Sequence, residues 1–478
     1  MNRKTLVGIA VVLGGVVLSW ALPVFSACAA SYGDIRYTLE DAKGAVGAGV
    51  YITSYKGKAT ALTIPKVILG EPVVSVKLTG LKKKLKNLTV TSTGSLRALD
   101  VHGNALTTLN LGSNAQLRSV NCDKNKLKVL TLGSKPQLSQ LSCEKNVLTA
   151  LDTSGCPRLN VLHVSSNKLI RLPLGSNTQL TELLCPKNQL PILNVSPLVK
   201  LQTLDCSVNK LKILAIANNP ALTTLNCSDN KLTALVLLYN TRLKTLRCAK
   251  NKLTVLPLVT NTALTYLDCS HNKITVLPLT TQSRLEHLAC TSNKLSVLNF
   301  ANNLRLKYLS CGSNKLTALN VSILKQLDYL AVSGNKLLVL NISSNPALTY
   351  LSCASNKLVV LDLRANPKLK TLYCGNNKLI DLILKRQSEI KELHAEKNLL
   401  GLLPTNCTPK LEILQCNNNL LKNLALGPNG RVKKVLCEKN LFTILDVTKH
   451  PALRTLRVSK GVRVDKDKGA NIAISYVK

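Results

Sequence analysis

Cysteine is the residue type with the most evident chemistry in this chain of 478 residues, which contains 16 of them. Thirteen stand at one position of a 21-residue repeat, where four further repeats carry Val101, Val164, Val332 or Ala395. A position that accepts Cys, Val and Ala requires a small apolar side chain, so we interpret these residues as structural reduced thiols. The thirteen are Cys122, Cys143, Cys185, Cys206, Cys227, Cys248, Cys269, Cys290, Cys311, Cys353, Cys374, Cys416 and Cys437.

Disulfides and metal binding are two other uses of cysteine. Neighbouring strands about 4.8 Å apart would allow disulfides by distance, but the parallel directions of the side chains and the odd number argue against them. No His or carboxylate shares the inward row, so we expect no metal there. Cys156 and Cys407 lie outside the row and many repeats apart, so they cannot pair with each other.

Residues for acid–base catalysis are scattered. The chain has six His, at positions 102, 163, 271, 287, 394 and 450. The repeat does not bring His, Ser and Asp into a shared cleft. His271 and His287 stand near Asp268 and Glu286, which we interpret as surface variety. We therefore expect no enzyme and no cofactor.

Aromatic residues form a candidate binding row. Tyr266, His287, Tyr308, Tyr329 and Tyr350 occupy one position in five consecutive repeats, and Tyr373 follows two residues later in its strand. Tyrosine is enriched at interfaces, so the row is a candidate site for a protein or a sugar. The alternative is cross-strand stacking that only stabilises a sheet.

Lysine forms a second candidate row, at another position in eleven repeats. We expect this row to bind acidic glycans, lipopolysaccharide or other anions, with nucleic acid the weaker target. The alternative is a solvated edge copied along with the repeat. The row comprises Lys126, Lys168, Lys210, Lys231, Lys252, Lys273, Lys294, Lys315, Lys336, Lys357 and Lys378.

An Asn sets the period that must position all these side chains. It recurs 17 times from Asn104 to Asn440, once in every 21-residue repeat and without an insertion. Leu stands eight and five residues before it in most repeats, and five residues after it in all of them. Alternation before the Asn predicts a short strand with Leu and Cys inward, and the Asn is expected to bond the next turn of the chain. Such coils bury a core only by stacking, so the sequence predicts a solenoid about 80 Å long.

This unit, LxxLxCxxNxLxxLxLxxNxx, resembles that of bacterial leucine-rich repeat proteins, and with Cys in the strand it is similar to internalin J and its relatives. The resemblance covers residues 96–460. It implies a mainly β leucine-rich repeat solenoid with parallel strands on a concave binding face, extended or short β segments on the back and little helix. It also implies a secreted or surface adhesin-like protein. Leu403-Pro404-Thr405-Asn406 lacks the Gly of a sortase signal, so sortase attachment is not supported.

The length suggests about three domains, but the repeat favours a single one. We expect an N-terminal cap with a degenerate first repeat over residues 30–95, the array over 96–460 and a C-terminal cap over 461–478. Residues 51–57, 64–65 and 70–73 resemble the opening module of BspA-type repeat proteins. Leu85 and Leu88 keep the period with Lys83 in place of Asn. At the other end Gly461 replaces Asn, Arg463 replaces Leu, and residues 472–476 predict a closing strand.

Residues 1–29 are typical of a secretory signal. Arg3 and Lys4 precede an apolar run over residues 6–21, and small residues follow. Ala27-Cys28-Ala29 fits ordinary signal cleavage, whereas residues 24–28 resemble a lipobox that would make Cys28 a lipidated first residue. A retained anchor helix is a further alternative. Lipidation at Cys28 is the one membrane attachment that we expect, and the resulting location is secreted, cell-surface or outer-membrane lipoprotein.

These features favour an exported bacterial protein that binds a host or neighbouring-cell protein or glycan through its concave face, in adhesion or host interaction. The alternative is a structural envelope protein whose net charge of +39 holds anionic polymer of its own cell, such as a polysaccharide. A carbohydrate-binding module would use the same tyrosines. The sequence does not identify the ligand.

Overall fold

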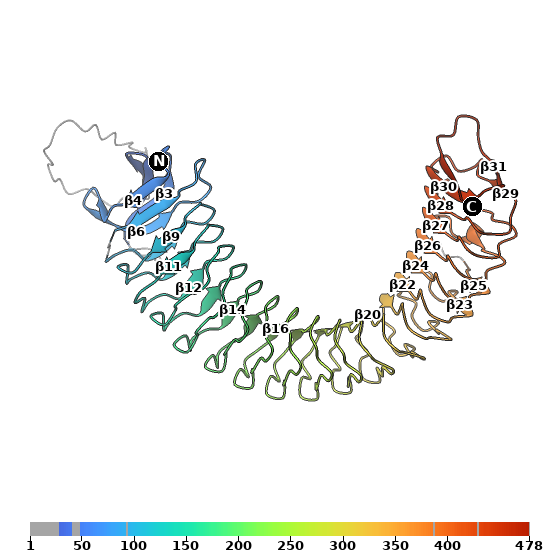
Figure 1. Ribbon diagram of the computed structural model, residues 1–478, viewed down its shortest axis with the longest axis horizontal. Coiled ribbons are helices and arrows are strands. Elements are labelled where there is room, and N and C mark those ends of the chain that lie inside the picture. The colour runs from blue at the N-terminus through green and yellow to red at the C-terminus, as the bar shows by residue number, and fades with distance from the viewer. Residues whose placement is uncertain (1–27, 41–47, 92–93, 386–387, 428–429, 478) are drawn as a thin grey trace, which may run out of the picture.

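The chain forms a solenoid that bends into a U (Figure 1). The computed structural model describes residues 28–40, 48–91, 94–385, 388–427 and 430–477. The predicted signal sequence therefore lies outside the described residues except for Cys28 and Ala29. No helix of the described residues is both long and apolar enough to cross a bilayer. The one helical element that they contain is the short 3-10 helix η1 (Thr405–Cys407), so the predicted mainly β solenoid is confirmed.

A parallel sheet lines the inner side of the U, and each repeat contributes one strand to it. Neighbouring strands pair in register one repeat apart, as Leu204 with Leu225 and Leu225 with Leu246. The strands are β8 (Ala98–Asp100), β10 (Ser119–Asn121), β12 (Gln140–Ser142), β13 (Val161–His163), β14 (Glu182–Leu184), β15 (Thr203–Asp205), β16 (Thr224–Asn226), β17 (Thr245–Arg247), β18 (Tyr266–Asp268), β19 (His287–Ala289), β20 (Tyr308–Ser310), β21 (Tyr329–Ala331), β22 (Tyr350–Ser352), β24 (Thr371–Tyr373), β26 (Glu392–His394), β27 (Ile413–Gln415), β28 (Lys434–Leu436) and β30 (Thr455–Ser459).

Each concave strand is short because the chain turns sharply after it. In β15 the central Leu204 is fully buried, Cys206 follows it inward, and Thr203 and Asp205 face the concave side. The residue before the ladder Asn then takes a left-handed conformation, with φ of 55° at Val208 and 53° at Lys250. This turn sends the chain away from the sheet, so two side chains per strand remain on the concave surface.

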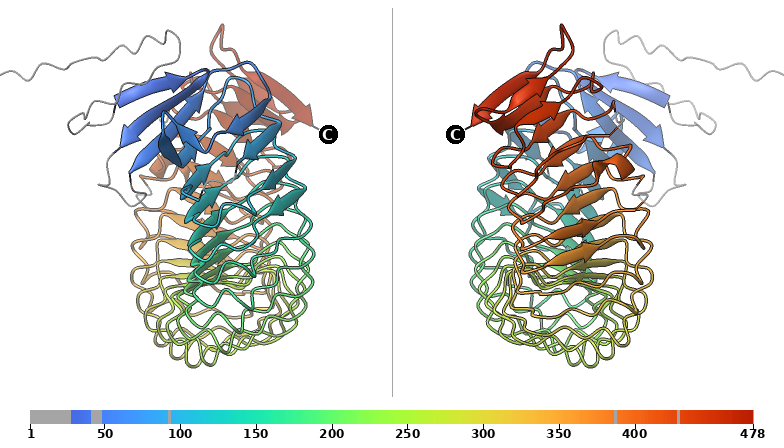
Figure 2. Two further views of the ribbon diagram at one scale, coloured as in Figure 1. Left: turned by 90° about the vertical axis from the view of Figure 1, so that its left-hand side faces the viewer. Right: turned by 90° about the vertical axis from the view of Figure 1, so that its right-hand side faces the viewer.

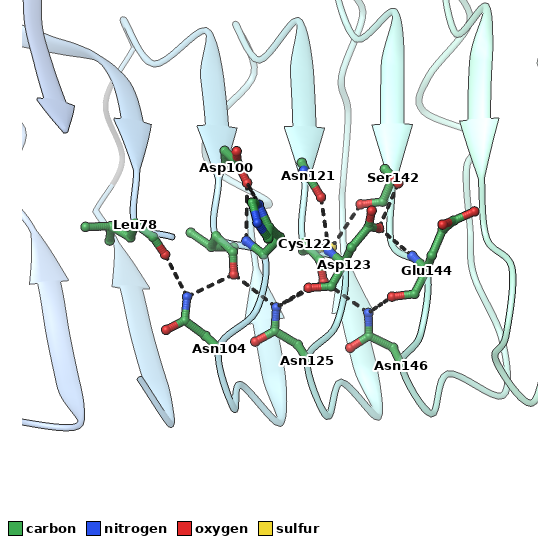
Figure 3. A network of polar contacts seen from close by, with 12 residues as sticks. Leu78, Asp100, Asn104, Asn121, Cys122, Asp123, Asn125, Ser142, Glu144 and Asn146 are labelled. Atoms are coloured by element: carbon green, nitrogen blue, oxygen red, sulfur yellow. Dashed lines mark hydrogen bonds and ion pairs between the residues drawn. The ribbon is translucent and has the colours of Figure 1, made fainter. Parts of the chain in front are cut away.

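The repeated Asn closes the corner, but its bonds run to the preceding coil rather than to the following one. Asn125 accepts a hydrogen bond from the Leu106 N–H at 3.0 Å and donates to the Val101 carbonyl at 3.0 Å, both in the coil before. It also donates to the Cys122 carbonyl of its own coil at 3.1 Å. Figure 3 shows Asn104, Asn125 and Asn146 lined up below their strands in this way. The expected ladder is confirmed, with its direction reversed.

A second ladder, to which the sequence analysis assigned no role, stands ten residues after the first. Asn240 is fully buried and donates to the carbonyls of Ile216 and Asn219, at 3.0 and 2.9 Å. Asn261 repeats these bonds one coil later. The row tolerates other side chains, among them Lys135 and Gln282, whose side chains also donate to carbonyls of the preceding coil. Coils with a polar side chain at this position are therefore tied to the preceding coil at two corners, whereas coils with Leu198 or Leu324 there have only the first ladder.

The back of the solenoid is extended, as predicted, and pairs into strands only near the two ends. Because the middle coils have no strands on the back, they can separate there while the concave strands stay paired, and the stack curves (Figure 1). The expected concave face is thus the inner side of an arc. The back strands are β9 (Thr108–Asn110), β11 (Val129–Thr131), β23 (Val360–Asp362), β25 (Asp381–Ile383), β29 (Ile444–Asp446) and β31 (Arg463–Asp465).

Further strands close the two ends of the stack (Figure 2). At the N-terminal end β6 pairs parallel with both β3 and β8, and β4 pairs with β7 on the back. At the C-terminal end β32 pairs parallel with β30, which confirms the predicted closing strand. These strands are β1 (Cys28–Tyr32), β2 (Ile35–Glu40), β3 (Gly49–Tyr55), β4 (Ala61–Ile64), β5 (Val67–Ile68), β6 (Glu71–Lys77), β7 (Asn87–Val90) and β32 (Ala473–Val477).

The last coil departs from the strict period. The regular repeat placed Arg463 at an inward Leu position, and this assignment is wrong. In the structure Arg463 pairs with Ile444, and Val464 pairs with the inward Leu445. This coil is two residues shorter than the others, so the apolar Val464 takes the inward position and Arg463 is exposed. A charge at the predicted position would have been buried without a partner, which explains the change of register.

Candidate binding face

The aromatic row lies on the concave face as predicted. Tyr266, His287, Tyr308, Tyr329 and Tyr350 are the first residues of β18 to β22 and stand opposite one another in the ladder. All five side chains are half-buried. Tyr373 is the last residue of β24, and Thr371 takes the position next to Tyr350.

The five rings form a continuous face-to-face stack. Successive ring centroids are 4.1, 3.9, 4.2 and 4.3 Å apart, with interplanar angles of 4–10°. Tyr373 joins at 5.9 Å and a tilt of 46°, and its other side stacks on His394 at 4.3 Å. At the opposite end the Arg247 guanidinium lies 4.7 Å from the Tyr266 ring centroid, a cation–π contact. The sequence did not indicate Arg247 or His394 as members of this stack. Arg247 reaches Tyr266 diagonally from the neighbouring strand, and His394 joins because it stands opposite Tyr373, which is itself diagonal to Tyr350.

The stack determines which atoms a partner could reach. Each inner ring is covered on both faces by its neighbours, so ring edges and hydroxyl groups face the concave side. Burial raises the pKa of Tyr329, and the adjacent Tyr308 and Tyr350 hydroxyls raise it further. The Tyr329 phenol therefore stays neutral, and the hydroxyl groups form a row of hydrogen-bonding groups on an apolar support. Cross-strand stacking, the structural alternative, is thus present, and it leaves the edges of the rings available.

Carboxylates are more frequent than basic groups on the concave positions, despite the net charge of +39. The concave positions are those six, four and two residues before each ladder Asn, or before Gly461 in the last coil. Lys or Arg stands at only three of them, Arg247, Lys434 and Arg457. Histidines there pair with acids, His163 Nε2 with Glu182 at 2.6 Å and His102 Nδ1 with Asp100 at 2.9 Å. The acidic residues at these positions are Asp100, Asp123, Glu144, Glu182, Asp205, Asp268, Glu392, Glu396 and Glu438.

A polar hollow of about 480 Å³ lies over β8 to β13, near the N-terminal end of the concave face. Asp123 is one of its lining residues and accepts hydrogen bonds from the Ser142 hydroxyl at 2.7 Å and from the Glu144 N–H at 2.6 Å (Figure 3). Burial raises the pKa of Asp123. The sequence analysis did not single out this hollow. The sequence could have indicated it, because Asp100, Asn121 and His163 are polar residues at concave positions of nearby repeats.

The cysteine row lies behind the sheet and takes no part in the surface. The 15 cysteines whose side chains the structure describes are free thiols, and the 13 in the row are buried. Burial raises the pKa of Cys227, Cys311 and Cys353 to about 12. The described side chains contain no group of three His, Cys, Asp or Glu arranged to hold a metal ion. The side chain of Cys28, the predicted lipidation site, lies outside the described residues.

The lysine row runs along the edge next to the Asn corner. All eleven side chains are exposed, and their backbone N–H groups bond the preceding coil, as Lys252 to the Leu232 carbonyl at 2.8 Å. None of the ion pairs found between described residues involves these lysines. Lys210 alone has a recorded side-chain contact, 3.1 Å to the Gln189 amide oxygen. The row is therefore a line of solvated charges, separate from the aromatic stack.

Comparisons with known proteins agree with this architecture. No family model matches the chain, and no curated protein sequence matches it. Among solved structures it is similar to the functional domain of InlJ from Listeria monocytogenes, which includes a cysteine ladder, with a TM-score of 0.59 and 28% identity over 71% of this chain and 74% of that one. It is also similar to YopM from Yersinia enterocolitica, with a TM-score of 0.72 and 25% identity over 88% of this chain and 92% of that one.

A plant peptide hormone receptor, RGFR1, has the same fold, with a TM-score of 0.63 and 18% identity over 88% of this chain and 70% of that one. Similarity therefore extends to repeat proteins of quite different origin, whereas the row of buried cysteines is shared with InlJ. The chain is a leucine-rich repeat solenoid of the bacterial type, with 21-residue coils and a cysteine ladder similar to that of InlJ.

Proposed function

We propose that the concave face binds a protein partner through the stacked aromatic row of Tyr266, His287, Tyr308, Tyr329 and Tyr350, together with Tyr373. The observation that carries this proposal is a rigid row of half-buried tyrosines at the middle of a concave sheet. Tyrosine contributes large contact area at low entropy cost and is enriched among residues that dominate binding energy. RGFR1, which shares the fold, is a peptide hormone receptor solved in complex with RGF2.

The stacking favours a protein over a glycan as the partner. A sugar ring usually packs on the face of an aromatic ring, and the inner rings of this row have both faces covered by neighbours. Hydroxyl groups and ring edges can instead bond backbone and side-chain groups of a protein. A role in adhesion or host interaction, at the surface of the producing cell or after secretion, is our interpretation from the signal-like N-terminus and from the resemblance to InlJ.

Two triple variants test the proposal. Replacing Tyr308, Tyr329 and Tyr350 by Ala removes both the stack and the hydroxyls, whereas replacing the same three by Phe keeps the stack. Surface proteins captured from host cells and from the producing cells by the wild type would be compared by quantitative pull-down. We expect the Ala variant to lose the specific partner by at least about tenfold, as for a group of residues that dominates binding.

Tyr239→Ala is the matched control, since Tyr239 is 57% exposed and lies outside the concave face. It should capture the partner like the wild type. Circular dichroism establishes that each variant is folded, and the Phe variant separates loss of the hydroxyls from loss of sheet stability. Equal capture by the wild type and by a folded Ala variant would show that the row has only a structural role.

The exposed lysine row supports a second candidate function, the binding of anionic polymer of the cell's own envelope. Nine lysines from Lys210 to Lys378 follow one another at about one strand spacing, within a Debye length, and none has a carboxylate partner. Retention on a heparin column should fall in a variant with Lys252, Lys273 and Lys294 changed to Gln. A variant with Lys368, Lys370 and Lys391 changed to Gln has the same net charge and is the control. Identical elution of the two variants would favour a non-specific charge effect.

A further inference from the structure

The back of the middle coils carries no charged residue, although the chain has 63 Lys and Arg. This holds for six consecutive coils, and the corresponding segments are residues 233–239, 254–260, 275–281, 296–302, 317–323 and 338–344. We call these segments the back patch. Their inward residues, such as Leu256 and Leu277, fill the core. The outward residues are Val, Pro, Thr, Ala, Ser and Asn, together with Leu238, Tyr239, Ile323 and Leu338.

Large apolar side chains of the back patch are exposed. Val259, Val276 and Val297 are 64%, 67% and 70% exposed, and Leu238 is 50% exposed. Val255, Val276, Val297 and Val339 hold the same position in their coils, so they form one line across the back. Large apolar side chains that are exposed together on one face mark a candidate interaction surface.

Basic residues border the back patch on both sides. Lys231, Lys252, Lys273, Lys294, Lys315 and Lys336 stand two residues before its six segments, and all are exposed. Arg242, Arg284 and Arg305 lie beyond its other border and are exposed too. Apolar side chains flanked by Lys and Arg are the pattern of proteins that lie in the interface of an anionic membrane.

The place of the patch in the arc agrees with contact to an extended surface. Its first five coils contain the strands from β16 to β20, which lie at the bottom of the U in Figure 1. The back forms the outside of the arc, so a surface that touches the bottom of the U meets these coils before either arm. The concave sheet faces the opposite way.

We propose that the back patch docks onto an anionic lipid surface, with Val255, Val259, Val276 and Val297 at the level of the acyl chains and the bordering lysines on the headgroups. A second copy of the chain fits less well, because back-to-back contact would bring two basic borders together. Docked in this way, the molecule presents the concave face and its tyrosines away from the membrane. The inference is independent of the identity of any concave-face partner.

Flotation of the full mature protein with lipid vesicles tests the proposal. Vesicles of phosphatidylglycerol and phosphatidylcholine should bind the protein, and vesicles of phosphatidylcholine alone should bind it at least about tenfold less, since each nearby Lys or Arg adds attraction to anionic lipid. Val255→Asp with Val276→Asp should abolish binding to the anionic vesicles. Leu399→Asp with Leu420→Asp is the matched control, since these residues are 47% and 45% exposed in coils outside the patch.

A third variant, with Lys231, Lys252 and Lys273 changed to Gln, should weaken binding to the anionic vesicles. Circular dichroism shows whether each variant is folded. The proposal is overturned if the folded Val255→Asp, Val276→Asp variant still binds the anionic vesicles, because charge alone would then explain the binding. The proposal is also overturned if the wild type ignores both vesicles and light scattering finds a dimer that the same substitutions dissociate, since the patch is then an interface between copies.

Discussion

Burial governs the chemistry of the thirteen ladder cysteines. Each is enclosed by leucines of its own and neighbouring coils, and burial favours the neutral thiol over the thiolate. The thiolate is the reactive form, so the thiols of the folded protein should be inert toward alkylation and oxidation. Cys407, which is only partly buried, is the exception among the described cysteines.

Alkaline pH should therefore unfold the protein. The pKa of Cys227, Cys311 and Cys353 is raised to about 12 in the folded state, from an ordinary value of 9.0. The unfolded chain releases these protons first, so the stability is complete below about pH 9 and is lost as the pH rises toward 12. Each thiol contributes about 1.4 kcal/mol per pH unit in that window. We expect a cooperative transition in circular dichroism above pH 9, and reaction with iodoacetamide only after it.

Replacing Cys227, Cys248 and Cys269 by Val gives the control for this prediction. Val occupies the same position at Val164 and Val332, so the fold should accept the change. The midpoint of alkaline unfolding should move to higher pH in this variant. If the midpoint stays where it is, ionisation of other groups, such as the tyrosines, causes the transition.

Val208 is strained by the left-handed turn that ends its strand. Its φ is 55°, a conformation that β-branched residues disfavour, whereas Asn376 and Asn418 occupy the same position in other coils. Val208→Asn should raise the free energy of unfolding by about 1 kcal/mol. Urea unfolding at neutral pH measures this change. Lys250→Asn, at the same position in another coil with an unbranched side chain, should give a smaller gain.

At the scale of the coil, the Asn ladder is the element on which stacking depends. Asn251 accepts from the Leu232 N–H at 2.9 Å and donates to the Cys227 carbonyl at 3.0 Å, both in the preceding coil. Asn251→Ala leaves these buried groups without partners and should destabilise the protein by about 3 kcal/mol. The neighbouring Lys252→Ala, on an exposed side chain, should change the stability by less than about 0.5 kcal/mol. Urea unfolding compares the two, and an equally small effect of both would contradict the role of the ladder.

The sequence predicted the coil well because its signal repeats without insertion. The Asn spacing, the inward Leu positions and the concave tyrosine row are all confirmed. The features that the sequence did not predict depend on contacts between neighbouring coils. Arg247 reaches Tyr266 diagonally, Tyr373 reaches Tyr350 diagonally, and the last coil shortens by two residues to keep Arg463 out of the core. A period read along one chain contains no information on such contacts.

At the scale of the whole molecule, charge is unevenly distributed. The lysine row and the arginines of the other edge are basic, the back patch is uncharged, and the concave positions carry more acidic than basic residues. Curvature and this separation of surfaces both arise from the stacking of many coils. They could not be predicted from one repeat, because they depend on how far neighbouring coils separate on the back.

Salt should stabilise the protein, since the lysines of the row repel one another at about one strand spacing. We expect the melting temperature to rise by several degrees between about 0.02 and 0.5 M NaCl as this repulsion is screened. In a variant with Lys231, Lys273 and Lys315 changed to Gln, both the low-salt instability and its salt dependence should diminish. A melting temperature that is insensitive to salt in the wild type would show that the solvated lysines are too far apart for their repulsion to lower the stability.

The direction of the Asn bonds has a consequence for how the molecule is assembled. The side chain of every ladder Asn makes its bonds between coils with the coil that precedes it in the chain, as Asn125 does with Val101 and Leu106. A coil that has just emerged from the ribosome or from a translocation channel finds the backbone partners of its Asn side chain already in place. Other groups, such as the Cys122 N–H that donates to the Ser142 carbonyl, pair only when the next coil arrives. Synthesis from the N-terminus can therefore add coils one at a time, because each new coil docks through its Asn side chain on the coil made just before it.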